Sequence, residues 1–176
     1  MSIPSPTGDE QAMGERVREE LERMGLQVQW QHVEDGRPNV VGLWEGAGGG
    51  PSLMFNGHMD TSYSGREPWL AGIPGFQPDG FVRDGRIYGL GISNMKGALA
   101  CYVEAVQALQ DAGVRLRGDV LVAAVCGEIE KTQWHPDFVG REYRGYAAGS
   151  RFLTSHGGVA DMCVLGEPTE QRVVLG

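Results

Sequence analysis

Three short segments of the chain carry side chains that could bind a metal ion and activate water. His58 and Asp60 stand at the end of an apolar run over residues 52–57. Glu128 follows a second run over residues 119–125, and Glu167 follows a third over residues 162–165. Each run reads as a buried strand, which would place a rigid element behind each side chain. Imidazole nitrogen and carboxylate oxygen are zinc ligands, and a further carboxylate can accept a proton from water. The pattern indicates a metallohydrolase.

The spacing of His58 and Asp60 favours a direct interaction between their side chains. Residues two apart in an extended segment project from the same face, so Asp60 could accept a proton from one ring nitrogen while the other binds a metal. Taken alone, the pair also fits a hydrogen-bonded histidine beside a loop. Glu128 could be a general base or a solvated loop carboxylate. Glu167, fixed by the following Pro168, could be a ligand or a turn residue.

Two other chemistries find little support in the sequence. The segment 89–97 is rich in glycine but lacks the Gly-x4-Gly-Lys-Ser/Thr spacing of a phosphate-binding loop. Cys126 lies near Glu128, yet no histidine stands close to it in sequence to activate a thiol. Nucleotide binding and thiol catalysis are therefore disfavoured.

The composition limits the classes of partner that the protein could bind. The 176 residues include 15 Lys plus Arg and 23 Asp plus Glu, a net charge of −8. This balance argues against nucleic acid and against an anionic membrane surface, and no apolar run approaches the roughly 20 residues of a membrane span. The first residues lack the features of a signal peptide, so we expect a cytoplasmic protein. Its three cysteines lie in separate apolar stretches, where we expect buried, reduced thiols.

The elements that would position these residues alternate along the chain. Helical periodicity predicts helices over residues 10–24, with Asp9 as N-cap, over 96–112 and over 146–155. Strands are predicted over residues 26–33, 39–44, 52–57, 119–125, 162–165 and 172–175. Residues 62–91 are rich in Gly and Pro and read as a functional loop with two short strand-like pieces. This order predicts an α/β domain with a mostly parallel or mixed sheet flanked by helices.

Taken together, four ordered motifs resemble a family of zinc amidohydrolases and metallopeptidases. The family includes acetylornithine deacetylase, succinyl-diaminopimelate desuccinylase, aminoacylase and glutamate carboxypeptidases. The motifs stand here at residues 58–61, 89–97, 127–129 and 166–169. The resemblance implies a zinc-exopeptidase-like catalytic domain that hydrolyses an N-acyl or peptide amide beside a free carboxylate in a small, amino-acid-derived substrate.

The resemblance also implies roles for individual residues. His58 and Glu167 would hold one zinc ion and Glu128 would be the general base. The residue at position 94 would bridge to a second zinc, and the peptide bond between residues 94 and 95 would be cis.

Two departures from the family pattern concern the second metal. The bridging aspartate is replaced by Asn94, whose amide offers one neutral oxygen, and a ligand glutamate is replaced by Ile129, which cannot bind a metal. We therefore expect one metal ion, held by His58, Glu167 and Asn94. The ion would be zinc, with cobalt or manganese as alternatives. A shift in register could instead bring Glu130 into the place of Ile129.

The resemblance also predicts the extent of the domain. Residues 1–176 would form the N-terminal portion of the catalytic domain. A lid or dimerisation domain, the C-terminal part of the catalytic domain and a distal histidine ligand would lie outside the chain. We expect little turnover from these residues alone, and a homodimer for the full-length protein. The rival interpretation is a non-catalytic homologue, or an inactive fragment, that binds an amino-acid derivative or a partner.

Overall fold

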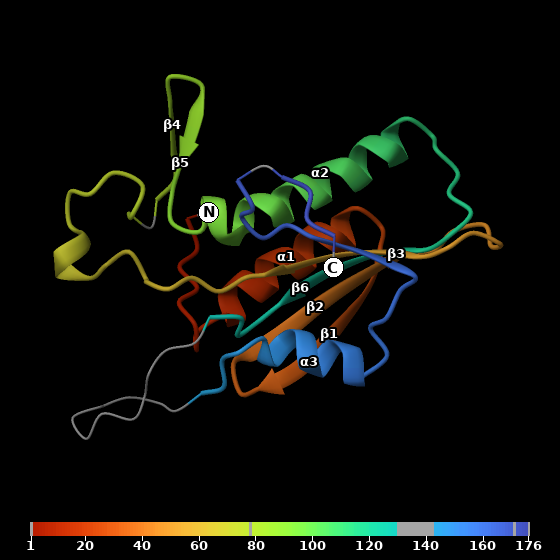
Figure 1. Cartoon of the computed structure of the whole chain (residues 1–176), viewed down its shortest axis with the longest axis horizontal. Coiled ribbons are helices and arrows are strands. Elements are labelled where there is room, and N and C mark those ends of the chain that lie inside the picture. Colours follow the sequence, from red (N-terminus) through yellow and green to blue (C-terminus); the bar gives the residue numbers. More distant parts are fainter. Residues whose placement is uncertain (1, 78, 130–142, 171, 176) are drawn as a thin grey trace.

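A five-stranded mixed sheet in the order β1-β2-β6-β3-β7 forms the centre of the molecule (Figure 1). The computed structural model describes residues 2–77, 79–129, 143–170 and 172–175. Strand β3 (Leu53–His58) runs parallel to both of its neighbours, β6 (Val120–Val125) and β7 (Met162–Leu165). Strands β1 (Gln27–Glu34) and β2 (Arg37–Trp44) form a hairpin that joins β6 in antiparallel orientation. The predicted α/β class with a mixed sheet is confirmed.

Helices cover both faces of the sheet. Helices α1 (Gln11–Arg23) and α2 (Gly97–Asp111) lie on one face and α3 (Ala148–Ser155) on the other (Figure 1). Successive residues of a strand point to opposite faces. Accordingly, Val40 packs in the apolar cluster under α1 and α2, whereas its neighbour Val41 packs in the cluster under α3. The sheet is therefore the middle layer of three. None of the described helices is long and apolar enough to span a bilayer.

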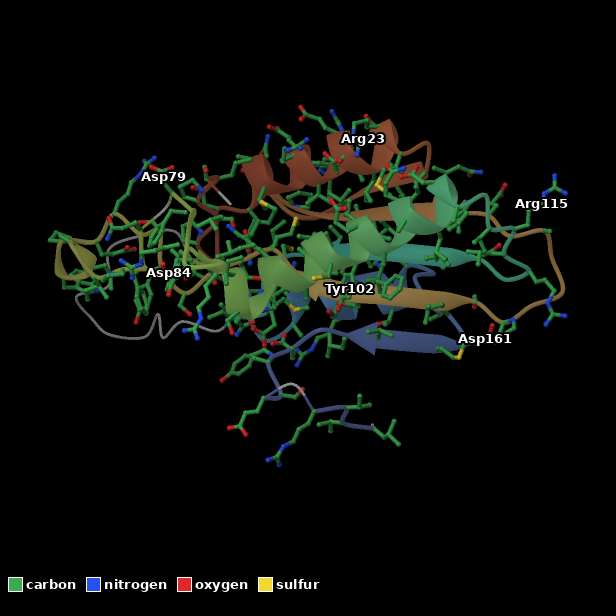
Figure 2. All side chains as sticks on the ribbon, turned by 90° about the horizontal axis from the view of Figure 1, so that it is seen from above. Arg23, Asp79, Asp84, Tyr102, Arg115 and Asp161 are labelled. Atoms are coloured by element: carbon green, nitrogen blue, oxygen red, sulfur yellow. The ribbon has the colours of Figure 1, made fainter. Side chains whose placement is uncertain are left out.

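A lobe outside the sheet is built from residues 62–91. It contains the short helix η1 (Pro68–Leu70) and the hairpin of β4 (Phe81–Arg83) and β5 (Arg86–Tyr88), which projects away from the sheet (Figure 1). In Figure 2, Asp79 and Asp84 mark this lobe at one end of the molecule, and Arg115 lies at the other end. The arrow of β7 points toward the end that carries the lobe. A short helical turn, η2 (Ile92–Lys96), then leads into α2. The lobe thus lies at the carboxyl end of the parallel strands.

Three expectations from the sequence are wrong. Asp9 is not the N-cap of α1; Glu10 holds that position without a side-chain cap, because its carboxylate is engaged elsewhere. Residues 172–175 form no strand, and Val173 and Leu175 are each 91% exposed, because these residues pair with no neighbouring strand.

The third error concerns the cysteines. Only Cys126 is buried, whereas Cys101 and Cys163 are exposed. Cys101 lies on the side of α2 away from its buried residues, and Cys163 lies on the edge strand β7, all of whose residues are exposed. All three are free thiols, as expected.

Candidate metal and catalytic site

Three strand ends bring the candidate residues to one point. His58 is the last residue of β3, Glu128 follows β6 and Glu167 follows β7. Because these strands are parallel neighbours, their carboxyl ends meet at one edge of the sheet. His58 Nε2 lies 3.7 Å from Glu128 Oε2 and 3.5 Å from Glu167 Oε1. One ligand atom from each residue lies within 4.8 Å of the other two, and within the described part of the chain this is the one such group.

His58 is almost fully buried, with an acceptor at each ring nitrogen. Its Nδ1 lies 3.0 Å from the backbone carbonyl of Asp60 and 3.3 Å from the carboxylate, and its Nε2 lies 2.6 Å from Asn94 Oδ1. Burial opposes protonation of the ring, but Asp60, Asn94 and the charge of Glu167 together raise the pKa of His58 to about 9. A cation at Nε2 would take the place of the proton there, while Nδ1 keeps its own.

Asp60 does more than orient the histidine. Its fully buried carboxylate accepts hydrogen bonds from the backbone N–H groups of Glu128 (3.1 Å) and Ile129 (2.9 Å) and from the Thr7 hydroxyl (2.9 Å). Burial favours the protonated acid, but His58 and the two backbone donors hold the pKa of Asp60 below its usual value. Asp60 therefore stays ionised at neutral pH and fixes the loop that carries Glu128. No feature of the sequence predicts this contact.

A second buried carboxylate holds the preceding backbone amide. Glu10 accepts a hydrogen bond from Gly127 N at 3.1 Å and receives two from Arg37, each at 2.8 Å. The side chains of both Glu10 and Arg37 are fully buried. The three consecutive backbone N–H groups of residues 127–129 thus donate hydrogen bonds to two buried carboxylates. Glu10 reads in the sequence only as the start of a helix, so this contact was missed.

Lys96 is another buried charge near the site that the sequence did not indicate. Its ammonium donates a hydrogen bond to the backbone carbonyl of Ile3 at 2.9 Å. Burial lowers the pKa of Lys96 to about 8, although the charge of Asp60 opposes this shift. The preceding bond between Asn94 and Met95 is cis, as the resemblance implies.

The donor atoms fit one divalent cation. Two ligands about 2.1 Å from a tetrahedral ion lie about 3.4 Å apart, close to the 3.5 Å between His58 Nε2 and Glu167 Oε1. The carboxylates also favour a cation electrostatically. Burial, with repulsion from Glu128 and Asp60, raises the pKa of Glu167 above its usual value despite the proximity of His58. An ion between these groups would relieve that repulsion.

Asn94 fits less well. Its Oδ1 lies 2.6 Å from His58 Nε2, which is hydrogen-bonding distance and shorter than the roughly 3.4 Å between two ligands of a tetrahedral ion. Its side chain would have to shift to join the ligand set. Ile129 offers no donor on its side chain, and Glu130 lies outside the described residues.

The chain matches a known family over most of this region. Residues 54–170 match the sequence model of a protein family, Peptidase family M20/M25/M40. A succinyl-diaminopimelate desuccinylase of Anaplasma marginale is 32% identical over 173 residues, which cover 98% of this chain and 41% of the relative. The chain thus spans less than half of the length of that relative.

Two solved structures share the fold. A tripeptidase from Staphylococcus aureus superposes with a TM-score of 0.68 at 22% identity, over 93% of this chain and 39% of that one. An M20 family metallo-carboxypeptidase from Sulfolobus solfataricus superposes with a TM-score of 0.64 at 18% identity, over 94% and 35%. The mixed sheet with its flanking helices is therefore an arrangement found in these enzymes.

Proposed function

The chain belongs to peptidase family M20/M25/M40, and on that premise we propose that it is the metal-binding part of a hydrolase that cleaves amide bonds. The observation that carries the proposal is the convergence of His58 Nε2, Glu128 and Glu167 at the ends of three parallel strands. A nitrogen ligand, a carboxylate ligand and a further carboxylate that can accept a proton are groups that a metal-assisted hydrolysis uses.

We propose that residues 1–176 are part of a catalytic domain completed elsewhere in a full-length protein. The supporting observation is the share of its relatives that the chain covers, 41% of the desuccinylase and 39% of the tripeptidase. A lid or dimerisation domain and the rest of the catalytic domain would account for the remainder. A homodimer and a cytoplasmic location belong to the same proposal, and the three free thiols are consistent with the latter.

In the proposed mechanism, His58 and Glu167 would hold a divalent cation, zinc in the first instance, with Asn94 as a third ligand. When bound, the cation would lower the pKa of a nearby water and polarise the amide carbonyl. Glu128 Oε2 takes a proton from the attacking water and passes it to the leaving amine nitrogen. Asp60 keeps the proton on His58 Nδ1 and anchors the backbone of Glu128.

The names of two relatives support a proposal for the substrate class. They act, by their names, on a succinylated amino acid and on peptides. We propose an N-acyl amino acid or a peptide-like molecule with a free carboxylate.

The first experiment counts zinc per chain by elemental analysis after equilibration with zinc and removal of free ion. We expect about one zinc in the wild type and none in His58→Ala. His156→Ala is the matched control, because His156 is exposed and its Nδ1 lies 2.8 Å from the Phe152 carbonyl, away from the site. Two zinc ions would overturn the single-metal assignment. No zinc in the wild type would overturn the metal site itself.

A second candidate function is supported by Asn94 and Ile129. If their loss of metal-binding chemistry reflects a loss of catalysis, the protein would bind an amino-acid derivative without hydrolysing it. Replacing Glu128 separates the two functions, because only a hydrolase needs its proton transfer.

A further inference from the structure

A pocket of about 370 Å³ adjoins the metal site on the side of the lobe. Asn94, whose Oδ1 contacts His58, and Ile129, which follows Glu128, both line it. Thr61, next to Asp60, lines it as well. The remaining walls come from residues 62–63, 75–76 and 87–93. A group bound in this pocket would therefore lie directly beside the atoms proposed to react.

The walls of the pocket are apolar and aromatic. Tyr63, Phe76 and Tyr88 contribute rings, and the aliphatic side chains are Ile87, Leu90, Ile92 and Ile129. Tyr88 stacks on Phe81 with ring centroids 5.0 Å apart, so its ring is supported from behind. Phe76 is 40% exposed and Ile87 56% exposed, which leaves apolar surface open to an occupant.

The approach of Gly91 to Thr61 gives the pocket part of its shape. Gly91 has a φ of +83°, and a Cβ at this position would lie 2.8 Å from Thr61 Cγ2. Only glycine adopts this conformation and this close contact without strain. The wall next to Asp60 is thus a fixed feature of the backbone.

In the described part of the chain, the wall of the pocket carries no charged side chain that could pair with an anion. The neighbouring site instead carries three carboxylates, on Asp60, Glu128 and Glu167, which a single divalent cation only partly neutralises. A carboxylate placed in the pocket would lose water without gaining a charged partner among the described lining residues, which is costly.

We infer that this pocket binds an uncharged, apolar or aromatic acyl group of the substrate, an inference that rests on the proposed amide hydrolysis. A cavity of about 150 Å³ already accepts benzene in another protein, so 370 Å³ leaves room for a phenyl group with its carbonyl stem. Acyl groups that end in a carboxylate should bind less tightly, because no described residue that lines the pocket is a cation. The specificity therefore lies in the lobe and in Ile129.

The test compares two probes that differ only in the acyl group, N-benzoylglycine and N-succinylglycine. Their affinities are measured by isothermal titration calorimetry on the zinc-loaded chain carrying Glu128→Gln, which removes turnover from the measurement. We expect the benzoyl compound to bind at least about tenfold more tightly, equivalent to about 1.4 kcal/mol. Backbone amide shifts in NMR spectra should localise it to residues 61–63 and 87–94.

Three variants sharpen the comparison. Phe76→Ala should weaken the binding of N-benzoylglycine and leave the affinity for N-succinylglycine unchanged. Ile129→Arg places a cation in the wall and should reverse the preference. Val82→Ala is the matched control: Val82 lies in the same lobe, is 71% exposed and does not line the pocket, so both affinities should stay at the wild-type level.

The outcomes separate this inference from the proposed function. Equal affinities, tighter binding of N-succinylglycine, or no binding of either probe would overturn the inference. If the full-length protein hydrolyses succinyl amides in preference, the amide hydrolysis stands and the pocket assignment fails. If N-benzoylglycine binds as described but no amide is cleaved, the pocket stands and the hydrolase proposal fails.

Discussion

The carboxylate of Glu10 accepts a hydrogen bond from the backbone N–H of Gly127 at 3.1 Å, across 117 residues of sequence. The same carboxylate is paired with Arg37, and the next two N–H groups along the chain are held by Asp60. The loop that carries Glu128 is therefore fixed by charges from the N-terminal segment and from the end of β3. Removing either charge should disturb the site as well as the fold.

Replacement of Glu10 should cost substantial stability. Glu10→Ala leaves Arg37 buried without its bidentate partner and with Glu34 as its remaining carboxylate partner, so the loss should approach the roughly 3–5 kcal/mol of breaking a buried pair. The loss is measured as the free energy of unfolding in urea. Glu19→Ala is the control, since Glu19 on the same helix makes an exposed ion pair with Arg16, worth about 1 kcal/mol or less. Similar losses of unfolding free energy in the two variants would show that the buried pair contributes no more to stability than an exposed one.

Asp60→Asn should weaken zinc binding by about 10- to 100-fold, the usual effect of losing the partner of a ligand histidine. The amide keeps the size of the side chain but replaces one acceptor oxygen with a donor, which must face the N–H of Glu128 or Ile129 or the hydroxyl of Thr7. The affinity is measured by competition with a zinc chelator. Thr7→Val removes only one donor and should have a smaller effect. Wild-type affinity in Asp60→Asn would argue against its proposed part in the site.

Replacement of Glu128 should lower the rate of hydrolysis, whereas replacement of Glu167 should weaken zinc binding. In the full-length protein, Glu128→Gln should retain zinc and lower the rate of hydrolysis at least about a hundredfold, the usual range for a general base. Glu167→Gln should weaken zinc binding, because it loses a charged ligand. Zinc content and rate are measured on the same preparations. Zinc loss in both variants would make Glu128 a ligand, and an unchanged rate in Glu128→Gln would refute its role as the base.

Glu34 should make stability depend on pH in the acid range. Burial disfavours its charge, but hydrogen bonds from Arg144 and Arg37 hold the pKa of Glu34 below its ordinary value of 4.5. A lowered pKa means that the ionised form stabilises the fold above pH 4.5, and that this contribution is lost as the pH falls through the folded-state pKa. The difference in unfolding free energy between wild type and Glu34→Gln should therefore be largest near pH 7.

The measurement is urea denaturation at several pH values from 7 downward. The advantage of the wild type over Glu34→Gln should shrink below pH 4.5. An advantage that grows with acidity would contradict the assigned shift.

The sequence by itself determined the local elements and the identity of the main chemical groups. Helical spacing located α1 and α2 to within a residue or two, and the run over residues 162–165 coincides with β7. His58, Glu128 and Glu167 could be placed after strands because an apolar run and the polar residue that ends it are adjacent in the chain. Such features depend on neighbours in sequence, so a sequence records them.

Tertiary structure decided what those groups touch. The strand order, the antiparallel pairing of β2 with β6, and the pairing of Glu10 with Gly127 all join residues far apart in the chain. The failure of residues 172–175 to form a strand has the same origin, because an apolar run becomes a strand only beside a partner. Asp60 was recognised as the partner of His58, yet its hold on Glu128 and Ile129 depends on how β3 and β6 lie side by side. The apolar pocket beside Asn94 likewise exists only because residues 75–76 and 87–91 of the lobe lie beside Ile129 at the end of the sheet.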